Sequence, residues 1–138
     1  MFRRSGGSTR VLDEIFDAGA IIVGRRMFEL SGAGGRRSPI RDVRVFVVTH
    51  KPPTNDAFVG SPFAFITEGI GRAVERAVEA AGGRMVYVAG GATIAQQAFS
   101  AGLVDEIQIH LTPVLRGRGV HLFDGTAPKG AVQLEQTA

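Results

Sequence analysis

Three stretches of this sequence place residue types that suit phosphate directly after a predicted strand. The first is Gly24-Arg25-Arg26-Met27, which follows the apolar run Ala20–Val23. A glycine here allows a tight turn into a helix, whose first turn offers free N–H groups and the positive end of its dipole. Two arginines at a helix start oppose that dipole unless an anion lies beside them. A solvated arginine pair is the alternative that the sequence leaves open.

The second stretch is Thr49-His50-Lys51, which follows the β-branched run Val43–Val48. A hydroxyl, an imidazole and an ammonium at the end of a strand could hold a phosphate such as the adenosine 2′-phosphate of NADP. The alternative is a plain polar loop before Pro52-Pro53, with His50 as a surface histidine.

The third stretch is Gly90-Gly91-Ala92-Thr93-Ile94, after the apolar run Met85–Ala89. Glycines at the end of a buried strand let the backbone approach a pyrophosphate closely. Thr93 and Gln96 have the spacing of a capping box, so we expect a helix over Thr93–Ala101 that points its N–H groups outward. The order strand, glycines and helix suits a nucleotide site, although it is not the G-x-G-x-x-G fingerprint. A simple turn with a helix cap is the alternative.

The sequence offers little support for other chemistries. It contains no cysteine, no Gly-Lys-Ser/Thr P-loop and no G-x-S-x-G elbow. Its histidines are scattered without an i, i+4 pair, so we expect no metal site. Gly69-Ile70-Gly71 would place Val74 at the third glycine of a dinucleotide fingerprint, and we therefore interpret it as a helix start. No catalytic residue can be named from these patterns.

Length and composition indicate one globular domain. The chain has 138 residues, is 44% hydrophobic and carries a formal net charge of +3, which is enough chain to bury a core. The basic residues are nearly all arginine and do not form one long run, and aromatic residues free for stacking are scarce, so nucleic-acid binding is the weaker reading. The apolar runs fall short of the roughly 20 residues that span a bilayer. The first residues, Met1–Gly7, contain no apolar stretch, and we expect a cytoplasmic protein without membrane contact.

Periodicity predicts alternating strands and helices. One apolar stripe is typical of a helix that ends at Gly82-Gly83; its residues are Ile70, Ala73, Val74, Ala77, Val78 and Ala81. The alternation in Ile107–Leu111 favours an antiparallel or edge strand with one wet face. We predict helices over Thr9–Ala18, Arg25–Leu30, Ile70–Ala81 and Thr93–Ala101, and strands over Ala20–Val23, Val43–Val48, Phe63–Ile66, Met85–Ala89, Ile107–Leu111 and Val132–Glu135.

This order of elements predicts an α/β fold. We expect a three-layer αβα arrangement, with a mostly parallel sheet, an antiparallel edge and helices on both faces. Ligands of such sheets bind at the carboxyl ends of the strands. All three phosphate-suited stretches would lie at that edge.

Taken together and in order, these stretches resemble the dihydrofolate reductase-like family. The resemblance rests on the Gly-Arg segment Ala20–Glu29, the following strand Val45–His50 and the Gly-Gly turn within Met85–Ile94. Leu103–Phe123 is similar to the segment typical of one subgroup, that of the C-terminal pyrimidine reductase domain of riboflavin biosynthesis. The likeness covers most of Val11–Gly125.

The resemblance implies NADPH as cofactor and hydride transfer to a small pteridine- or pyrimidine-like heterocycle. It places Gly24, Arg25, Arg26 and Met27 at the phosphates, Thr49, His50 and Lys51 at the adenosine ribose and its 2′-phosphate, and Gly90, Gly91, Ala92, Thr93 and Ile94 around the pyrophosphate. It also implies a cis bond within the Gly-Gly pair and a homodimer.

The sequence departs from the family pattern at both ends. Members begin with a central strand that contributes to the substrate site and finish with a strand pair, whereas only Met1–Ser8 precede the first predicted helix here. We therefore expect residues 1–138 to form a single dihydrofolate reductase-like domain without the first strand and the C-terminal hairpin. A catalytically inactive NADP(H)-binding module, or a truncated family member, is the alternative function, and a basic nucleic-acid binder is a third.

Overall fold

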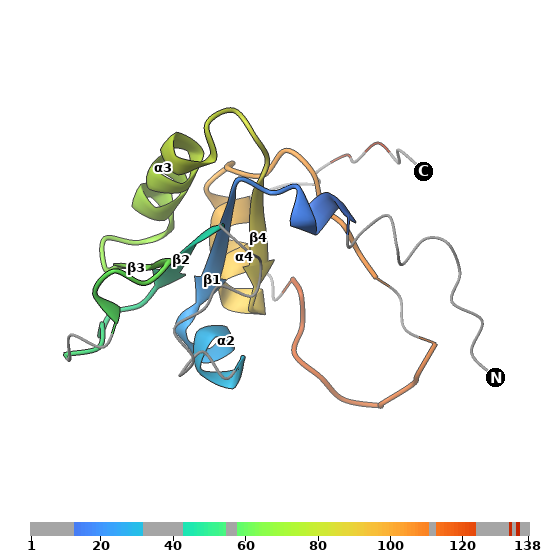
Figure 1. Ribbon diagram of the computed structural model, residues 1–138. Coiled ribbons are helices and arrows are strands. Elements are labelled where there is room, and N and C mark those ends of the chain that lie inside the picture. The colour runs from blue at the N-terminus through green and yellow to red at the C-terminus, as the bar shows by residue number, and fades with distance from the viewer. Residues whose placement is uncertain are drawn as a thin grey trace.

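The fold is built on a four-stranded parallel sheet (Figure 1). The computed structural model describes residues 13–31, 43–54, 58–110, 113–123, 133 and 135. Within them the strands lie in the order β3-β2-β1-β4, and each neighbouring pair is parallel. Their bounds are β1 (Ala20–Gly24), β2 (Arg44–Val48), β3 (Phe63–Ile66) and β4 (Val86–Gly90). The predicted α/β class and parallel sheet are confirmed.

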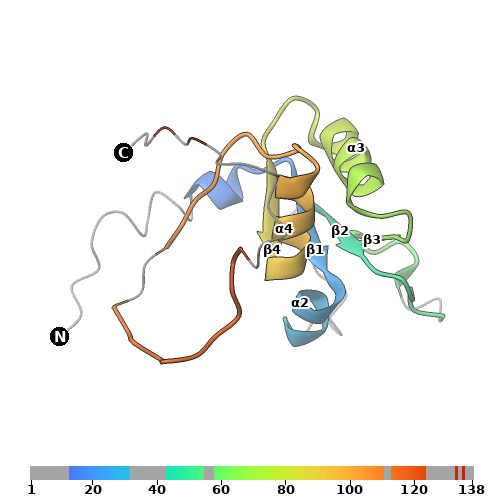
Figure 2. The ribbon, with the colours of Figure 1, turned by 180° about the vertical axis from the view of Figure 1, so that it is seen from behind.

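Helices cover both faces of the sheet. The helices with assigned bounds are α2 (Arg25–Leu30), α3 (Ile70–Ala81) and α4 (Ala92–Ser100), and residues 13–16 form a further helical turn. Figure 2 shows α4 in front of β4 and β1, with α3 beside it. The prediction for α2, α3 and β3 matches their bounds, and the other described elements differ by a residue or two. Of the first predicted helix, residues 9–12 lie outside the described part of the chain.

Alternation along the strands separates the core into two halves. Ile22 and Phe46 face α3 and α4, where the small residues Ala73, Ala77 and Ala81 bring α3 close to the sheet. The opposite face carries the other set of strand residues: Ile21, Val23, Val45, Val47 and Phe63. Successive strand side chains point to opposite faces, so the continuous apolar runs of β1 and β2 are what a sheet covered on both sides requires.

A cluster of aromatic rings holds α2 against the second face. Phe28 of α2 contacts Phe58, Phe63 and Phe65 edge to face, with ring centroids 5.6, 5.1 and 5.4 Å away. Edge-to-face pairs add roughly 0.5–1.5 kcal/mol each to the burial of the rings. This contact fixes a six-residue helix that could not be stable alone, and it sets the position of the arginines at the start of α2.

The predicted antiparallel edge is wrong for the residues that the structure describes. Residues 107–110 form no strand, and β4 pairs with β1 alone among the described strands. Ile109 is exposed, and Gln108 makes a side-chain hydrogen bond to Glu14 (2.7 Å) in place of backbone pairing. An extended segment becomes a strand only when a neighbour satisfies its N–H and C=O groups, and no described strand lies beside this one. The predicted strand Val132–Glu135 falls mostly outside the described residues.

No helix within the described ranges is long and apolar enough to cross a membrane.

Candidate functional site

The carboxyl ends of the strands open into one crevice. Its volume is about 760 Å³, within the range of roughly 300–1,000 Å³ that is usual for small-molecule sites. The residues that line it come from the turns after all four strands, from α2 and α4, and from a distant segment. They are Gly24, Arg25, Arg26, Met27, Leu30, Val48, Thr49, His50, Lys51, Thr67, Gly69, Gly91, Ala92, Thr93, Ile94, Gln97 and Val120.

The structure brings together all of the predicted cofactor-binding residues except Gly90. That glycine is the last residue of β4 and is buried behind the crevice wall. Sequence reasoning missed Thr67 and Gly69, although the same argument, polar residues and a glycine directly after strand β3, would have found them. Leu30, Val48, Gln97 and Val120 carried no comparable signal in the sequence.

The first turn of α4 lines the crevice and carries backbone donors without acceptors in the part of the chain that the structure describes. Its N-cap is Gly91, which supplies no side-chain cap. The N–H groups of Ala92 and Thr93 have no acceptor among the described residues, whereas those of Ile94 and Ala95 bond to the carbonyl of Gly91. The predicted capping box is therefore wrong, because the helix begins at Ala92 and Thr93 already lies inside it. The peptide bond between Gly90 and Gly91 is cis, as the resemblance implied.

Close packing between β1 and α4 closes the floor of the crevice. A Cβ atom added at Gly24 would lie 2.9 Å from Cγ1 of Ile94, closer than real Cβ contacts allow. The pairing of β1 with β4 also shifts register here: Ile22 pairs with Val88 and Val23 with Gly90. Such an irregularity re-aims a strand end and is frequent beside sites. The glycine at position 24 thus allows α4 to reach the crevice.

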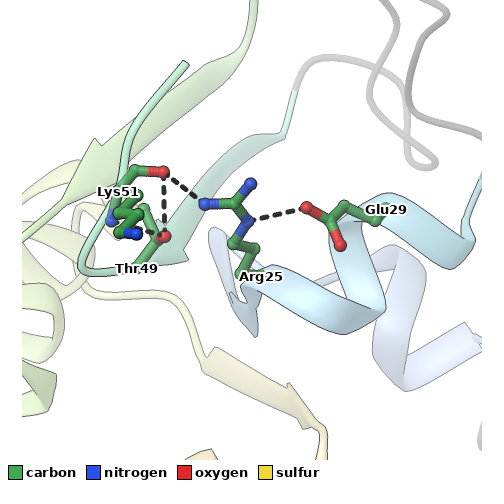
Figure 3. A network of polar contacts seen from close by, with 4 residues as sticks. All are labelled: Arg25, Glu29, Thr49 and Lys51. Carbon is green, nitrogen blue, oxygen red and sulfur yellow. Dashed lines mark hydrogen bonds and ion pairs between the residues drawn. The ribbon is translucent and has the colours of Figure 1, made fainter.

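Arg25 connects two of the turns. Its Nε donates to Oε1 of Glu29 over 2.6 Å, and its Nη1 donates to the carbonyl oxygen of Lys51 over 2.8 Å (Figure 3). The buried Thr49 exchanges two hydrogen bonds of 3.2 Å with the backbone of Lys51. The charge of Arg25 is already paired, whereas Arg26 has no carboxylate partner among the described residues.

Glu68 stabilises the turn that follows β3. Its Oε2 accepts hydrogen bonds from the backbone N–H of Thr67 (2.9 Å) and from its hydroxyl (3.1 Å). The bond from the backbone of Thr67 is the largest of the causes that lower the pKa of this carboxyl below its ordinary value. The carboxylate therefore orders the turn, although Glu68 itself is not among the described residues that line the crevice.

The chemistry of the crevice suits an anion with an apolar part. Arg26 and Lys51 line it, as do Ala92 and Thr93 of α4, whose N–H groups have no acceptor among the described residues. Met27, Leu30 and Val48 add apolar surface. None of the described lining residues is an aspartate or a glutamate. An extended ligand with phosphate groups would meet donors and positive charge without an opposing carboxylate.

Comparison with known proteins identifies the family of the chain. Residues 4–138 match the RibD C-terminal domain family. The chain is also similar to YwjB of Bacillus subtilis (strain 168), an uncharacterized protein. The two are 26% identical over an alignment of 149 positions, which covers 99% of this chain and 83% of the relative.

Proposed function

Because this chain belongs to the RibD C-terminal domain family of dihydrofolate reductase-like reductases, we propose that it binds NADPH in the crevice and reduces a small pteridine- or pyrimidine-like heterocycle. The single observation that carries the proposal is that backbone donors at the start of α4, without acceptors among the described residues, line the same crevice as Arg26 and Lys51. Backbone N–H groups at a helix start and arginine or lysine side chains are what a dinucleotide's phosphates require.

The residues of the crevice fit this cofactor. Space is open around Gly91, where an added Cβ would meet nothing within 4 Å, so a pyrophosphate can approach the backbone. Gly91, Ala92, Thr93 and Ile94, which line the crevice, would hold the pyrophosphate together with Arg26. Thr49, His50 and Lys51 would meet the adenosine ribose and its 2′-phosphate.

The bound cofactor would supply the hydride. The chain's own contribution is to bind, to orient and to exclude water. Arg25 fixes the backbone of Lys51, and Met27, Leu30 and Val48 provide an apolar wall. The substrate's proton donor has no carboxylate candidate among the described lining residues.

That last observation favours a second candidate function. A chain that holds NADPH but lacks a proton donor would be a binding module without turnover. The two candidates separate in one assay: oxidation of NADPH followed by absorbance, with dihydrofolate and with pyrimidine and flavin compounds offered as substrates. A binding module would give no rate above the no-substrate control, although it binds NADPH.

Calorimetric titration with NADPH and NADH tests the proposal directly. We expect NADPH to bind about ten-fold or more tightly than NADH, since a charged hydrogen bond to the 2′-phosphate contributes about 1.5–3 kcal/mol. Lys51→Gln should reduce this preference, and Arg84→Gln, an exposed arginine outside the crevice, should leave it unchanged. Failure of both nucleotides to bind would reject the proposal.

We also propose a homodimer. The segment after α4 exposes several apolar side chains, among them Ile109, Val114 and Leu115, and contiguous exposed apolar surface is typical of protein interfaces. Sedimentation equilibrium of the full chain tests this: a mass of one chain at micromolar concentration would contradict it.

A further inference from the structure

A second hollow, next to the crevice, is surrounded by three arginines. Arg26 of α2 lines a cavity of about 840 Å³ together with Arg116 and Arg118 of the segment 113–123, and Gly119 and Val120 complete the lining. We propose that this arginine hollow is a binding site for a phosphate group, separate from the pyrophosphate position at the start of α4.

The segment that carries two of these arginines is anchored to α4. Gln96 of α4 donates from Nε2 to the carbonyl oxygens of His121 (3.0 Å) and Leu122 (2.9 Å). The rings of Phe99 and Phe123 are in contact, with centroids 5.4 Å apart. In Figure 2 the segment returns in orange-red to the side of α4 and β4. The end of the segment that follows the arginines is thus held against α4 by contacts that do not involve their charges.

The three guanidinium groups have no counter-charge in the part of the chain that the structure describes. Neither an ion pair nor a hydrogen bond joins any of them to a described carboxylate. Arg25 differs from these three arginines, because its guanidinium group forms an ion pair with Glu29. Like charges around one hollow repel each other, and an anion between them reverses the sign of the interaction.

The chemistry of the hollow points to phosphate in particular. A guanidinium group presents its N–H donors in a planar fork that matches the oxygens of a phosphate in pairs. Gly117 has a φ of +68°, a turn conformation that L side chains rarely adopt. The turn lies between Arg116 and Arg118, which reach the same cavity.

The hollow and the crevice share a wall. Arg26 and Val120 line both cavities, so one ligand could extend from one into the other. The phosphate could belong to the dinucleotide or to a second ligand beside it. The identity of the molecule that carries the phosphate rests on the proposed function. The proposal that the arginine hollow binds a phosphate group does not.

The experiment uses the full chain and inorganic phosphate as the probe. Phosphate is titrated by calorimetry at constant ionic strength, set with sodium chloride, into the wild type and into the double variant Arg116→Gln/Arg118→Gln. We expect phosphate binding to be at least about ten-fold weaker in the double variant, because two charge-assisted contacts are removed. Arg76→Gln, an exposed arginine of α3 outside both cavities, is the matched control and should bind phosphate as the wild type does. Arg116→Lys/Arg118→Lys should recover part of the affinity.

The remaining arms identify the source and separate this inference from the proposed function. The same titration is repeated with the chain saturated with NADPH. Phosphate that still binds belongs to a second ligand's subsite, and phosphate that is displaced indicates the dinucleotide. If the chain binds no nucleotide, the proposed function fails while the phosphate titration still reports on the hollow. Equal phosphate binding by the wild type and the folded double variant, or no binding by either, overturns the inference.

Discussion

Arg25 donates a hydrogen bond from Nη1 to the carbonyl oxygen of Lys51 over 2.8 Å, and so joins the turn after β1 to the turn after β2. The same guanidinium group is paired with Glu29 through Nε. Its donors on two sides are therefore used within the protein. Arg25 acts as a positioning residue for the loop of Lys51, whereas its neighbour Arg26 lines both cavities and has no carboxylate partner among the described residues.

Arg25→Lys is expected to weaken NADPH binding about five-fold, equivalent to the loss of roughly one hydrogen bond. A lysine keeps the charge, but its single ammonium cannot span Glu29 and the carbonyl of Lys51 in the same fixed geometry. The measurement is calorimetric titration, with amide hydrogen exchange on the free protein as a second readout. The N–H of Lys51, which bonds to Thr49 Oγ1 over 3.2 Å, should exchange faster in the variant.

Arg72→Lys is the control for this change. Arg72 forms a similar exposed ion pair with Glu75 (2.9 Å) on α3, and it does not line the crevice. NADPH affinity should be unaffected there. A positioning role for Arg25 would be disproved by equal affinity in Arg25→Lys and the wild type, or by equal losses in the two variants.

Gly24→Ala is expected to reduce the free energy of unfolding by about 1–3 kcal/mol, the usual cost of overpacking. The new Cβ would lie 2.9 Å from Cγ1 of Ile94, an inner atom of a packed side chain, so α4 or its side chain must move. Because Ile94 lines the crevice, NADPH binding should weaken as well. Urea denaturation followed by circular dichroism measures the first effect.

Gly71→Ala provides a matched glycine on α3. An added Cβ there meets nothing within 4 Å, and alanine in a helix is about 0.5–1 kcal/mol more favourable than glycine. This variant should be slightly more stable than the wild type. A Gly24→Ala protein as stable as Gly71→Ala would show that the contact with Ile94 relaxes freely.

The sequence predicts those parts of the fold that depend on local pattern. Helix α3 has its bounds because a stripe of apolar residues runs from Ile70 to Ala81 and Gly82 adopts a φ of +58° after it. The crevice follows from the same kind of information. Each turn after a parallel strand lies at the same edge of the sheet, so the polar and glycine residues after β1, β2 and β4 had to meet.

The errors concern residues whose partners lie far away in the chain. Gln96 has capping-box spacing from Thr93, but the helix begins at Ala92 and the amide of Gln96 bonds to His121 and Leu122. Likewise, the alternation in Ile107–Leu111 is typical of a strand, yet pairing requires a neighbouring strand that sequence periodicity cannot supply. The local sequence pattern predicts whether a segment is a helix or a strand. The residues with which that segment forms hydrogen bonds depend on the tertiary structure.

The hydrogen bonds to Glu68 predict a pH dependence for the turn after β3. The pKa of this carboxyl is lowered in the folded protein, first by the bond from the N–H of Thr67. Because this pKa is lowered, the hydrogen bonds to the ionised carboxylate stabilise the folded protein at a pH above the ordinary pKa of glutamate. This stabilisation is lost as the pH falls through the pKa that Glu68 has in the folded protein. We expect the NMR titration midpoint of Glu68 in the native protein to lie below its midpoint in urea.

Thr67→Val tests the cause of this shift. Valine removes the hydroxyl donor at 3.1 Å but keeps the backbone N–H at 2.9 Å, so the midpoint should rise only part of the way toward its value in urea. A native midpoint for Glu68 equal to or above that in urea would contradict the assignment.

Gln96→Ala is expected to loosen the segment 113–123. The variant loses the two hydrogen bonds from Nε2 to the carbonyl oxygens of His121 and Leu122. Since these bonds are exposed, we expect them to contribute about 1 kcal/mol together, and the segment should open roughly five-fold more often. Helix α4 itself should remain intact, because alanine is a better helix former than glutamine.

Limited trypsin digestion measures this opening, since trypsin cleaves after arginine and the segment contains Arg116 and Arg118. Cleavage there should be about five-fold faster in Gln96→Ala, in proportion to the open population. Gln97→Ala is the matched control: it changes the adjacent glutamine of the same helix, whose side chain makes no hydrogen bond to a described residue. Equal cleavage rates in the two variants would mean that the contact of Phe99 with Phe123 holds the segment without Gln96. Faster cleavage in Gln96→Ala alone would establish that the amide of Gln96 holds the segment 113–123 against α4.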